Sequence, residues 1–228
     1  MSGPPRPDPT SARVTGTNDS SFVTFVSLLR VETVHHDGSP GAMTTATPLD
    51  PFTCALGELT QHVRDTHHAY LRAELPAIWE ELRITARSMP SASADLQLFG
   101  ALFGRFRSAL ENHVRKEDDV LFPFIERLER ALGDGAAPPK HSFGPLALPI
   151  EVLEAEHALG DRLLDRMRPV WRRWATHEDA PRWQFGLRER LDRLDADMQR
   201  HVHVEDAILF PRTIRLEGGT WPTAPASL

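Results

Sequence analysis

The sequence predicts an all-α protein whose main domain is an up-down-up-down four-helix bundle. Apolar residues recur at every third or fourth position along four long segments, which is the period of helices that bury one face. Segments rich in Gly, Pro and Ser separate them, as is typical of turns. An eleven-residue motif occurs twice with an offset of 88 residues, as HVRKEDDVLFP at 113–123 and HVHVEDAILFP at 201–211. The repeat indicates two similar helical hairpins.

The bundle is assigned to residues 51–217, between a different N-terminal segment and a flexible C-terminal tail at 218–228. Residues 1–50 begin with a stretch rich in Pro, Ser, Gly and Thr and are expected to be disordered or weakly structured. The apolar segment SFVTFVSLLRVETV at 21–34 fits either a short strand or part of a targeting peptide. Met43 is an alternative start of translation, which would leave everything before it without a structural role.

The first predicted hairpin joins a helix over about 52–88 to a helix over about 95–132. The apolar stripe of the first helix consists of Leu71, Leu75, Ile78 and Leu82. Extending this stripe backward reaches His68, and the stripe of the second helix contains His113 and Glu117.

The second predicted hairpin follows a Gly/Pro loop at 133–145 and has helices over about 147–176 and 182–216. Their apolar faces include His157 in the third helix and His201 in the fourth. Three prolines lie inside predicted helices: Pro76, Pro123 and Pro211. Each could end its helix, but the apolar period resumes beyond the first two, so continuous, kinked helices are favoured there.

The four core-facing histidines are expected to lie in one layer of the bundle. In antiparallel helices joined by short loops, residues equidistant from a loop lie at the same level. The midpoints between successive histidines fall at 90.5, 135 and 179, which are all within predicted turns or loops. The bundle therefore brings together the four imidazoles, with Glu117 and Glu205 about one turn away.

Glu117 and Glu205 each follow a histidine by four positions, so both side chains of a pair lie on one helix face. A buried carboxylate without a partner is expensive, and the repeated pair on two apolar faces therefore predicts a cation site. Three donors from each hairpin suit two metal ions bridged by the two carboxylates. Such a pair leaves coordination positions open for water, for an oxo or hydroxo bridge, or for a diatomic ligand.

Imidazole and carboxylate ligands without thiolate fit iron, manganese or zinc. Bridging glutamates with open positions favour two iron ions in a non-haem di-iron site over manganese or zinc. Affinity alone would favour zinc over iron, so this choice rests on geometry and precedent.

Composition excludes several classes of function. The net charge is −6, and no basic patch with interleaved aromatic residues supports a nucleic-acid partner. Cys54 is the only cysteine, which rules out a disulfide framework and Cys-rich zinc or iron–sulfur sites within one chain. No apolar run of about 18 residues predicts a membrane span. A cytoplasmic location is expected, since nothing in the cysteine usage points to an oxidising compartment.

Four segments resemble the hemerythrin-like (HHE) domain, and most closely the di-iron domain of the iron–sulfur cluster repair (RIC) proteins. They are HHAYLRAELP at 67–76, NHVRKEDDVLFP at 112–123, EAEHALG at 154–160 and HVHVEDAILFP at 201–211. Together with the helix spacing, the resemblance covers residues 52–216. It implies six iron ligands: His68, His113, Glu117, His157, His201 and Glu205.

The departures from the oxygen-carrying hemerythrins favour the repair-type ligand set. Those carriers use a further histidine on the third helix, where this chain has Asp161. In the last motif they use an aspartate five positions after the histidine as ligand, whereas the predicted ligand here is Glu205, four positions after His201. Repair proteins of the family commonly carry an N-terminal domain with a Cys-Cys pair, and this chain has no such pair.

Two further residues, His67 and Asp161, are candidates for supporting the metal ligands from the side chains that surround them. His67 precedes His68 but lies about 100° round an ideal helix, so a place on the helix flank is its alternative. Asp161 lies on the face of His157, where it could hydrogen-bond a bound water, approach an iron or be solvated.

Two functions of different classes are consistent with such a site. The first is a di-iron protein that reacts with O2 or NO in stress defence or iron–sulfur cluster repair, with an electron-donor protein or an iron–sulfur protein as partner. The second is a sensing or binding module that takes up O2, NO or iron without turnover. Ferritin-type iron handling is less favoured, because ferritin-like sites use Glu-x-x-His spacing.

Overall fold

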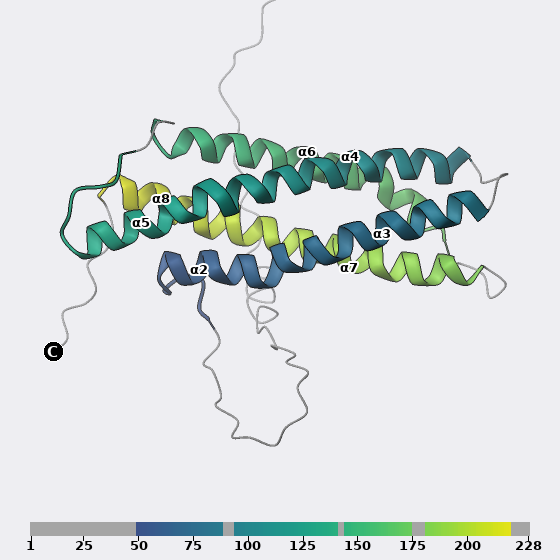
Figure 1. The fold of residues 1–228 in the computed structure, drawn as a ribbon, viewed down its shortest axis with the longest axis horizontal. Helices are drawn as coiled ribbons and strands as arrows, with labels where there is room; N and C mark the ends of the chain where they lie inside the picture. Colours follow the sequence, from purple (N-terminus) through teal and green to yellow (C-terminus); the bar gives the residue numbers. More distant parts are fainter. Residues whose placement is uncertain (1–48, 89–93, 141–143, 175–180, 220–228) are drawn as a thin grey trace, which may run out of the picture. The chain divides into compact units, whose positions relative to one another are not determined.

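The computed structural model describes residues 49–88, 94–140, 144–174 and 181–219. Within these ranges every regular element is helical, and the helices form four long segments that alternate in direction (Figure 1). The prediction of an all-α, up-down-up-down bundle is therefore confirmed. The predictions for the N-terminal segment, the C-terminal tail and the turns near 90 and 178 fall on residues outside the described ranges.

The first segment consists of α2 (Leu56–Val63), a π-helical turn η1 (Arg64–His68) and α3 (Ala69–Ser88). The second consists of α4 (Ala94–Lys116), the π-helical turn η2 (Glu117–Leu121) and α5 (Phe122–Gly133). The third is the uninterrupted helix α6 (Ala147–Trp171). The fourth consists of α7 (Arg182–Val204), the π-helical turn η3 (Glu205–Leu209) and α8 (Phe210–Glu217).

Two helix ends differ from the predicted bounds. The first helix begins at Leu56 rather than near residue 52. The carboxylate of Asp50 accepts hydrogen bonds from the backbone N–H of Phe52 (3.0 Å) and the hydroxyl of Thr53 (2.8 Å), which holds the preceding residues in a turn. The third helix ends at Trp171 rather than near residue 176, because the chain there passes into a tighter turn with hydrogen bonds spanning three residues.

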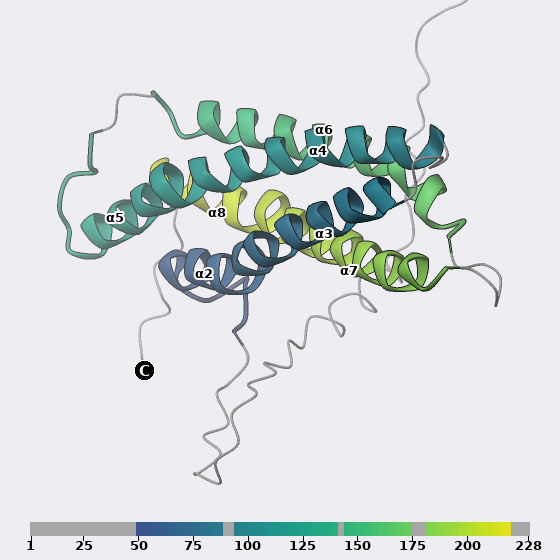
Figure 2. The ribbon, with the colours of Figure 1, turned by 45° about the vertical axis from the view of Figure 1, so that its right-hand side comes forward.

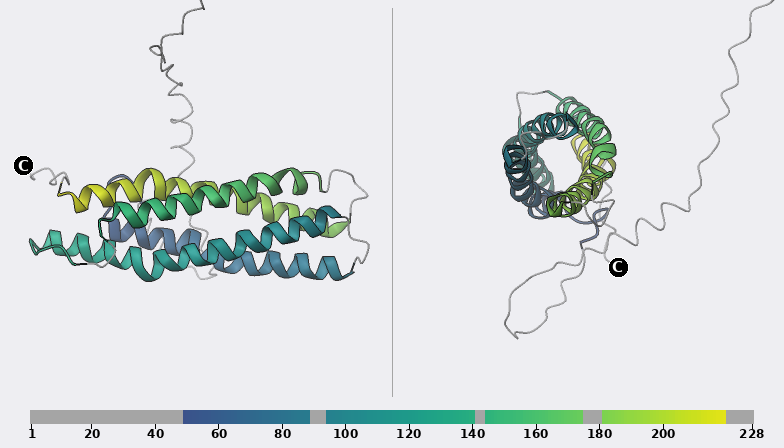
Figure 3. Two further views of the ribbon diagram at one scale, coloured as in Figure 1. Left: turned by 90° about the horizontal axis from the view of Figure 1, so that it is seen from above. Right: turned by 90° about the vertical axis from the view of Figure 1, so that its right-hand side faces the viewer.

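Each segment packs against two others around a common axis. Within the first hairpin α3 lies beside α4 and α2 beside α5, while α6 contacts α7 in the second. Figure 2 shows α4 beside α6 and α3 beside α7, which closes the ring of contacts. The view along the bundle in Figure 3 shows the four segments surrounding one centre. Among the described helices, none combines the length and apolar character that crossing a bilayer requires.

The apolar core consists of two clusters of buried side chains. The larger fills the half of the bundle between α3, α4, the end of α6 and α7, and includes Leu75, Phe103 and Trp171. The smaller fills the other half, between α2, α5, the start of α6 and α8, and includes Ile125 and Phe210. Along each segment the predicted ligands lie where one cluster gives way to the other. The core is therefore interrupted by one polar layer.

Two glutamates related by the repeat cap the two helices that open the hairpins. Glu129 in α5 accepts hydrogen bonds from the backbone N–H groups of Leu56 (2.6 Å) and Gly57 (2.8 Å) at the start of α2. Glu217, 88 residues later, accepts the backbone N–H of Leu146 just before α6 at 3.2 and 3.0 Å. Each carboxylate satisfies free N–H groups and balances the positive end of the helix dipole. Each hairpin is thus closed in the same way.

The prolines of the repeated motif follow directly on widened turns. Pro123 and Pro211 are each the second residue after a π turn, in which the N–H of Phe122 bonds to the carbonyl of Glu117 and that of Phe210 to Glu205. A proline has no N–H to donate and its ring crowds the preceding turn, so a wider turn relieves the conflict. The helices continue past both prolines, as expected for Pro123, and π turns rather than simple bends precede them.

The first helical segment is longer than its counterpart between the helix start and the histidine. Leu56, the first residue of α2, is 12 positions before His68, whereas Ala147, the first residue of α6, is 10 positions before His157. The π turn η1 lies within the longer stretch, and α6 has no such turn. A widened turn absorbs an additional residue without shifting the helix that follows, so both histidines reach the polar layer.

Replacing the capping glutamate of the second hairpin should destabilise the bundle. We expect Glu217→Ala to lower the free energy of unfolding by about 1 kcal/mol, the usual cost of losing an N-terminal cap. Urea denaturation followed by circular dichroism measures this loss. Glu151→Ala, an exposed glutamate in the first turns of α6, is the matched control. Equal midpoints for the two variants would contradict the capping role.

Candidate metal centre

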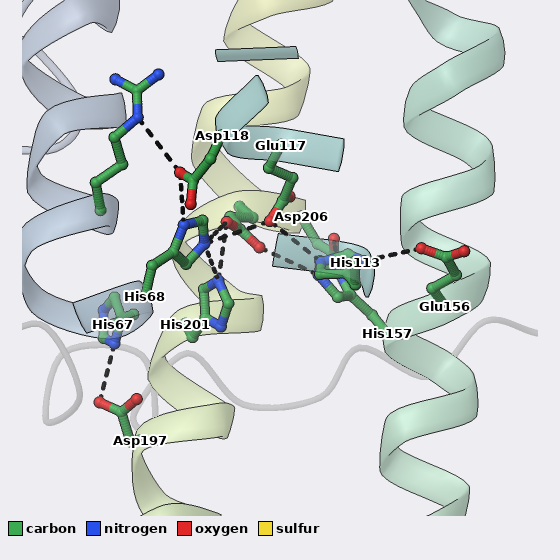
Figure 4. A network of polar contacts seen from close by, with 12 residues as sticks. His67, His68, His113, Glu117, Asp118, Glu156, His157, Asp197, His201 and Asp206 are labelled. Atoms are coloured by element: carbon green, nitrogen blue, oxygen red, sulfur yellow. Dashed lines mark hydrogen bonds and ion pairs between the residues drawn. The ribbon is translucent and has the colours of Figure 1, made fainter. Parts of the chain in front are cut away.

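The structure brings the six predicted ligands into one buried cluster at the centre of the bundle. They come from all four segments and are His68, His113, Glu117, His157, His201 and Glu205. None is more than 4% exposed, and both glutamates are fully buried. Figure 4 shows the imidazoles and carboxylates pointing toward one another. The expectation that the bundle places them at one level agrees with this arrangement.

The cluster divides into two overlapping groups of four donors. We call the group with His68 and His201 the first position and the group with His113 and His157 the second position. Glu117 and Glu205 belong to both groups. Within each group the ligand atoms all lie within 4.8 Å of one another, so each position could hold one metal ion.

Both carboxylates face the two positions at once. Oε1 of Glu205 lies 2.9 Å from Nε2 of His201, and its Oε2 lies 3.1 Å from Nε2 of His157. Oε2 of Glu117 lies 3.3 Å from Nε2 of His68 and 3.3 Å from Nε2 of His113. All four histidines therefore present Nε2 to the carboxylates. This is the arrangement that two ions bridged by two glutamates require.

Three of the four oxygens of the buried carboxylates lack a well-placed hydrogen-bond donor, and the exception is Oε1 of Glu205, which pairs with His201. Neither oxygen of Glu117, nor Oε2 of Glu205, accepts a well-formed hydrogen bond from the described residues. An ionised carboxylate removed from water without compensation is strongly unfavourable. Cations bound between nitrogen and oxygen donors would supply that compensation. The donor set therefore fits metal ions that accept both imidazole and carboxylate.

Two aspartates that the sequence reasoning did not assign hold the histidines that open the hairpins. Nδ1 of His68 lies 3.0 Å from Oδ1 of Asp118, and Nδ1 of His157 lies 2.7 Å from Oδ1 of Asp206. A carboxylate at Nδ1 fixes the tautomer that leaves Nε2 free for a metal. The sequence did contain a signal, because an aspartate directly follows the ligand glutamate in both copies of the motif.

Phenylalanines of the repeated motif fix the same two rings from one side. The ring of Phe122 stacks on His68 with centroids 5.5 Å apart and planes 6° apart. The ring of Phe210 stacks on His157 with centroids 6.1 Å apart and planes 7° apart. Each hairpin thus uses one aspartate and one phenylalanine to orient its first histidine.

The other two histidines are supported differently. Nδ1 of His113 lies 3.1 Å from Oε2 of Glu156, which is also paired with Lys116. Nδ1 of His201 has no hydrogen-bond partner among the residues the structure describes. Instead the ring of His201 stacks on that of His67, with centroids 5.3 Å apart and planes 12° apart.

His67 lies beside the ligands rather than on an exposed helix flank. It is 4% exposed, and its Nδ1 lies 2.9 Å from Oδ1 of Asp197, a buried residue of α7. The ideal-helix angle misplaced it, because His67 and His68 lie in η1, where the wider turn brings both inward. Its expected support of the site therefore takes the form of ring stacking.

Asp161 does not join the cluster. Its side chain is exposed, and neither of the two donor groups in the described chain includes it. It lies one turn beyond His157 on α6, where the helix face turns toward solvent. Among the described residues Asp161 makes no hydrogen bond or ion pair with a predicted ligand, and it interacts with His157 only through its charge. Its expected support of the ligands stays a prediction.

Comparison with known proteins agrees with the geometry. The family model described as the hemerythrin HHE cation binding domain matches residues 60–213. The iron-sulfur cluster repair protein DnrN of Neisseria gonorrhoeae is 26% identical over 164 residues, which cover 72% of this chain and 92% of that protein. The iron-sulfur cluster repair protein YtfE of Enterobacter sp. (strain 638) is 26% identical over 167 residues, covering 71% of this chain and 68% of that protein.

Protons and metal ions compete for the same imidazoles. Burial by itself lowers the pKa of His68, but hydrogen bonds to Asp118 and to the two glutamates raise it to about 11. Burial also lowers the pKa of His157, and hydrogen bonds to Asp206 and Glu205 raise it to about 10. Binding of a cation must therefore displace protons, so metal affinity increases with pH.

The metal-depleted protein should become less stable as pH rises, and the metal-loaded protein much less so. The ordinary histidine pKa of about 6.5 applies to the unfolded chain. Both folded pKa values are higher, so their stabilising effect is complete below about pH 6.5 and is lost as pH rises toward 10 and 11. Melting temperatures recorded from pH 6 to 10, before and after chelation, test this.

The control for this experiment is the double variant Asp118→Asn with Asp206→Asn, which removes the charges at Nδ1. We expect its metal-depleted form to lose less stability over the same pH range. Parallel melting curves for depleted and loaded wild-type protein would show that the histidines are not protonated in the depleted state.

Proposed function

The chain belongs to the hemerythrin HHE cation-binding family, and from that premise we propose that it is a non-haem di-iron protein acting on nitric oxide or dioxygen. One observation carries the proposal. Two buried carboxylates are shared by two pairs of histidines, which is a donor arrangement for two neighbouring ions. Six protein donors for two ions leave coordination positions for a small ligand.

Iron is the ion that best fits this proposal. The donors are imidazole nitrogen and carboxylate oxygen without sulfur, a mixture that non-haem iron shares with manganese and zinc. The relatives named as iron-sulfur cluster repair proteins favour iron among these three. Bound iron would supply a one-electron redox couple and open positions for a diatomic molecule.

The residues around the ligands would keep the centre rigid and dry. Asp118 and Asp206 hold their histidines by Nδ1, so that Nε2 stays directed at the metal positions. The two apolar clusters cover the layer from both ends of the bundle and keep bulk water from it. The shared glutamates would keep the two ions close through a change of charge.

We further propose that this centre serves the repair of iron–sulfur proteins under oxidative or nitrosative stress, in the cytoplasm. The similarity to repair proteins over more than two thirds of the chain supports this role. Electrons would come from a partner protein, since the sequence contains no flavin or haem motif. The partner that receives iron or electrons would be an iron–sulfur protein.

The metal content of protein purified without oxygen tests the centre. We expect two irons per chain in the wild type. The double variant His113→Ala with His201→Ala removes one ligand from each position and should lose both ions. His203→Ala alters a histidine outside both donor groups and should retain them. Unchanged iron content in the double variant would refute the ligand assignment.

Anaerobic stopped-flow mixing with nitric oxide separates reaction from sensing. If the protein is a reductase, the reduced form with an electron donor should consume nitric oxide over many turnovers. A sensing module would instead bind nitric oxide stoichiometrically and release it unchanged. The double variant defined above provides the background rate. Reversible binding without consumption would overturn the catalytic proposal and support the binding function.

A further inference from the structure

The two metal positions share their carboxylates but differ in what supports their histidines. We infer that the second position, between His113 and His157, binds metal more tightly, so that the ion between His68 and His201 is the exchangeable one. This inference rests on the proposed two-metal centre and adds which of its ions can be given up. All four histidines are 4% exposed or less, so access to solvent does not separate the positions.

Both histidines of the second position donate to a carboxylate. His113 pairs with Glu156 at 3.1 Å, and His157 pairs with Asp206 at 2.7 Å. A carboxylate at Nδ1 makes the imidazole a more basic ligand and fixes its orientation. Asp206 is partly exposed, and in the described part of the chain its ion-pair partner is His157.

The first position has one such carboxylate, and that one is shared with two cations. Asp118 lies 3.0 Å from Nδ1 of His68, and it is also paired with the guanidinium groups of Arg64 and Arg72. Hydrogen bonds and charge from two arginines draw electron density from the carboxylate. Glu156 of the second position is likewise shared with a cation, Lys116, so the sharing of a carboxylate does not separate the two positions. The difference between them lies in the fourth histidine, His201.

The fourth histidine lacks a carboxylate altogether. In the repeat, His67 precedes His68 where Glu156 precedes His157. Glu156 accepts the Nδ1–H of the histidine opposite it, whereas His67 only stacks on His201. Nδ1 of His201 is buried and finds no acceptor among the described residues. A buried N–H without a partner is unfavourable, so holding His201 in its ligating tautomer costs free energy.

The expected difference follows from the outer hydrogen bonds. Loss of one carboxylate behind a metal-bound histidine typically weakens metal binding by about 10- to 100-fold. The first position lacks one such partner, at Nδ1 of His201. We therefore expect its dissociation constant to exceed that of the second position by about tenfold or more.

A calorimetric titration of the metal-depleted full chain with Co²⁺ tests this order. We expect two binding events of unequal affinity, each with one ion per chain. His201→Ala should remove the weaker event and leave the tighter one, whereas His157→Ala should remove the tighter one. The reverse pattern, or two equal events in the wild type, would overturn the inference while leaving the two-metal centre intact. Fewer than two ions bound by the wild type would overturn both.

A milder variant keeps the test valid if a ligand variant does not fold. Glu156→Gln replaces a partly exposed residue at the edge of the centre and keeps every ligand. It should weaken the tighter event by about 10- to 100-fold and leave the weaker one unchanged. Glu154→Gln, an exposed glutamate of the same helix, is the matched control and should change neither. A selective loss of the weaker event in Glu156→Gln would contradict the inference.

Discussion

Two carboxylates buried at the centre of an apolar core are the constraint on which this structure depends. Glu117 and Glu205 are fully buried, and three of their four carboxylate oxygens accept no well-formed hydrogen bond from the described residues. Removing one partner of a buried ion pair costs about 3–5 kcal/mol, a large part of the stability of a single domain. The four histidines and the proposed ions stabilise the charge of these two carboxylates. The outer carboxylates in turn hold the histidines in place.

The internal repeat explains much of the architecture, including parts far from the ligands. Each hairpin provides a capping glutamate, a ligand pair, an aspartate and a phenylalanine at equivalent positions. The two copies of the repeat differ at the residue that precedes the first histidine of each hairpin. One hairpin contributes Glu156 and the other His67 beside the opening histidine, so the two metal positions have different surroundings.

The sequence was sufficient to predict the bundle and the grouping of the six donor side chains, because both follow from spacing. Residue positions along the chain are enough to find the helix period, the turns and the four histidine midpoints. None of these requires knowing which side chains are in contact. The outer carboxylates were missed because each acts on a different helix, and pairing across helices depends on rotation about the helix axes. The π turns were missed for a related reason. A single additional residue changes the face on which His67 lies, and an ideal helix angle cannot reveal it.

The division of the core into two apolar clusters would give the proposed ions a role in folding as well as in chemistry. Among the described residues the clusters lie on opposite sides of the polar layer, so side-chain packing joins the two ends of the bundle through the charged groups in that layer. With the ions bound, both ends should unfold together as one cooperative unit. Without ions, the layer would be held together by protonated imidazoles and the two carboxylates, and this attraction would weaken as the pH rises. The metal-free protein would then be the form that opens locally and is exposed to proteases.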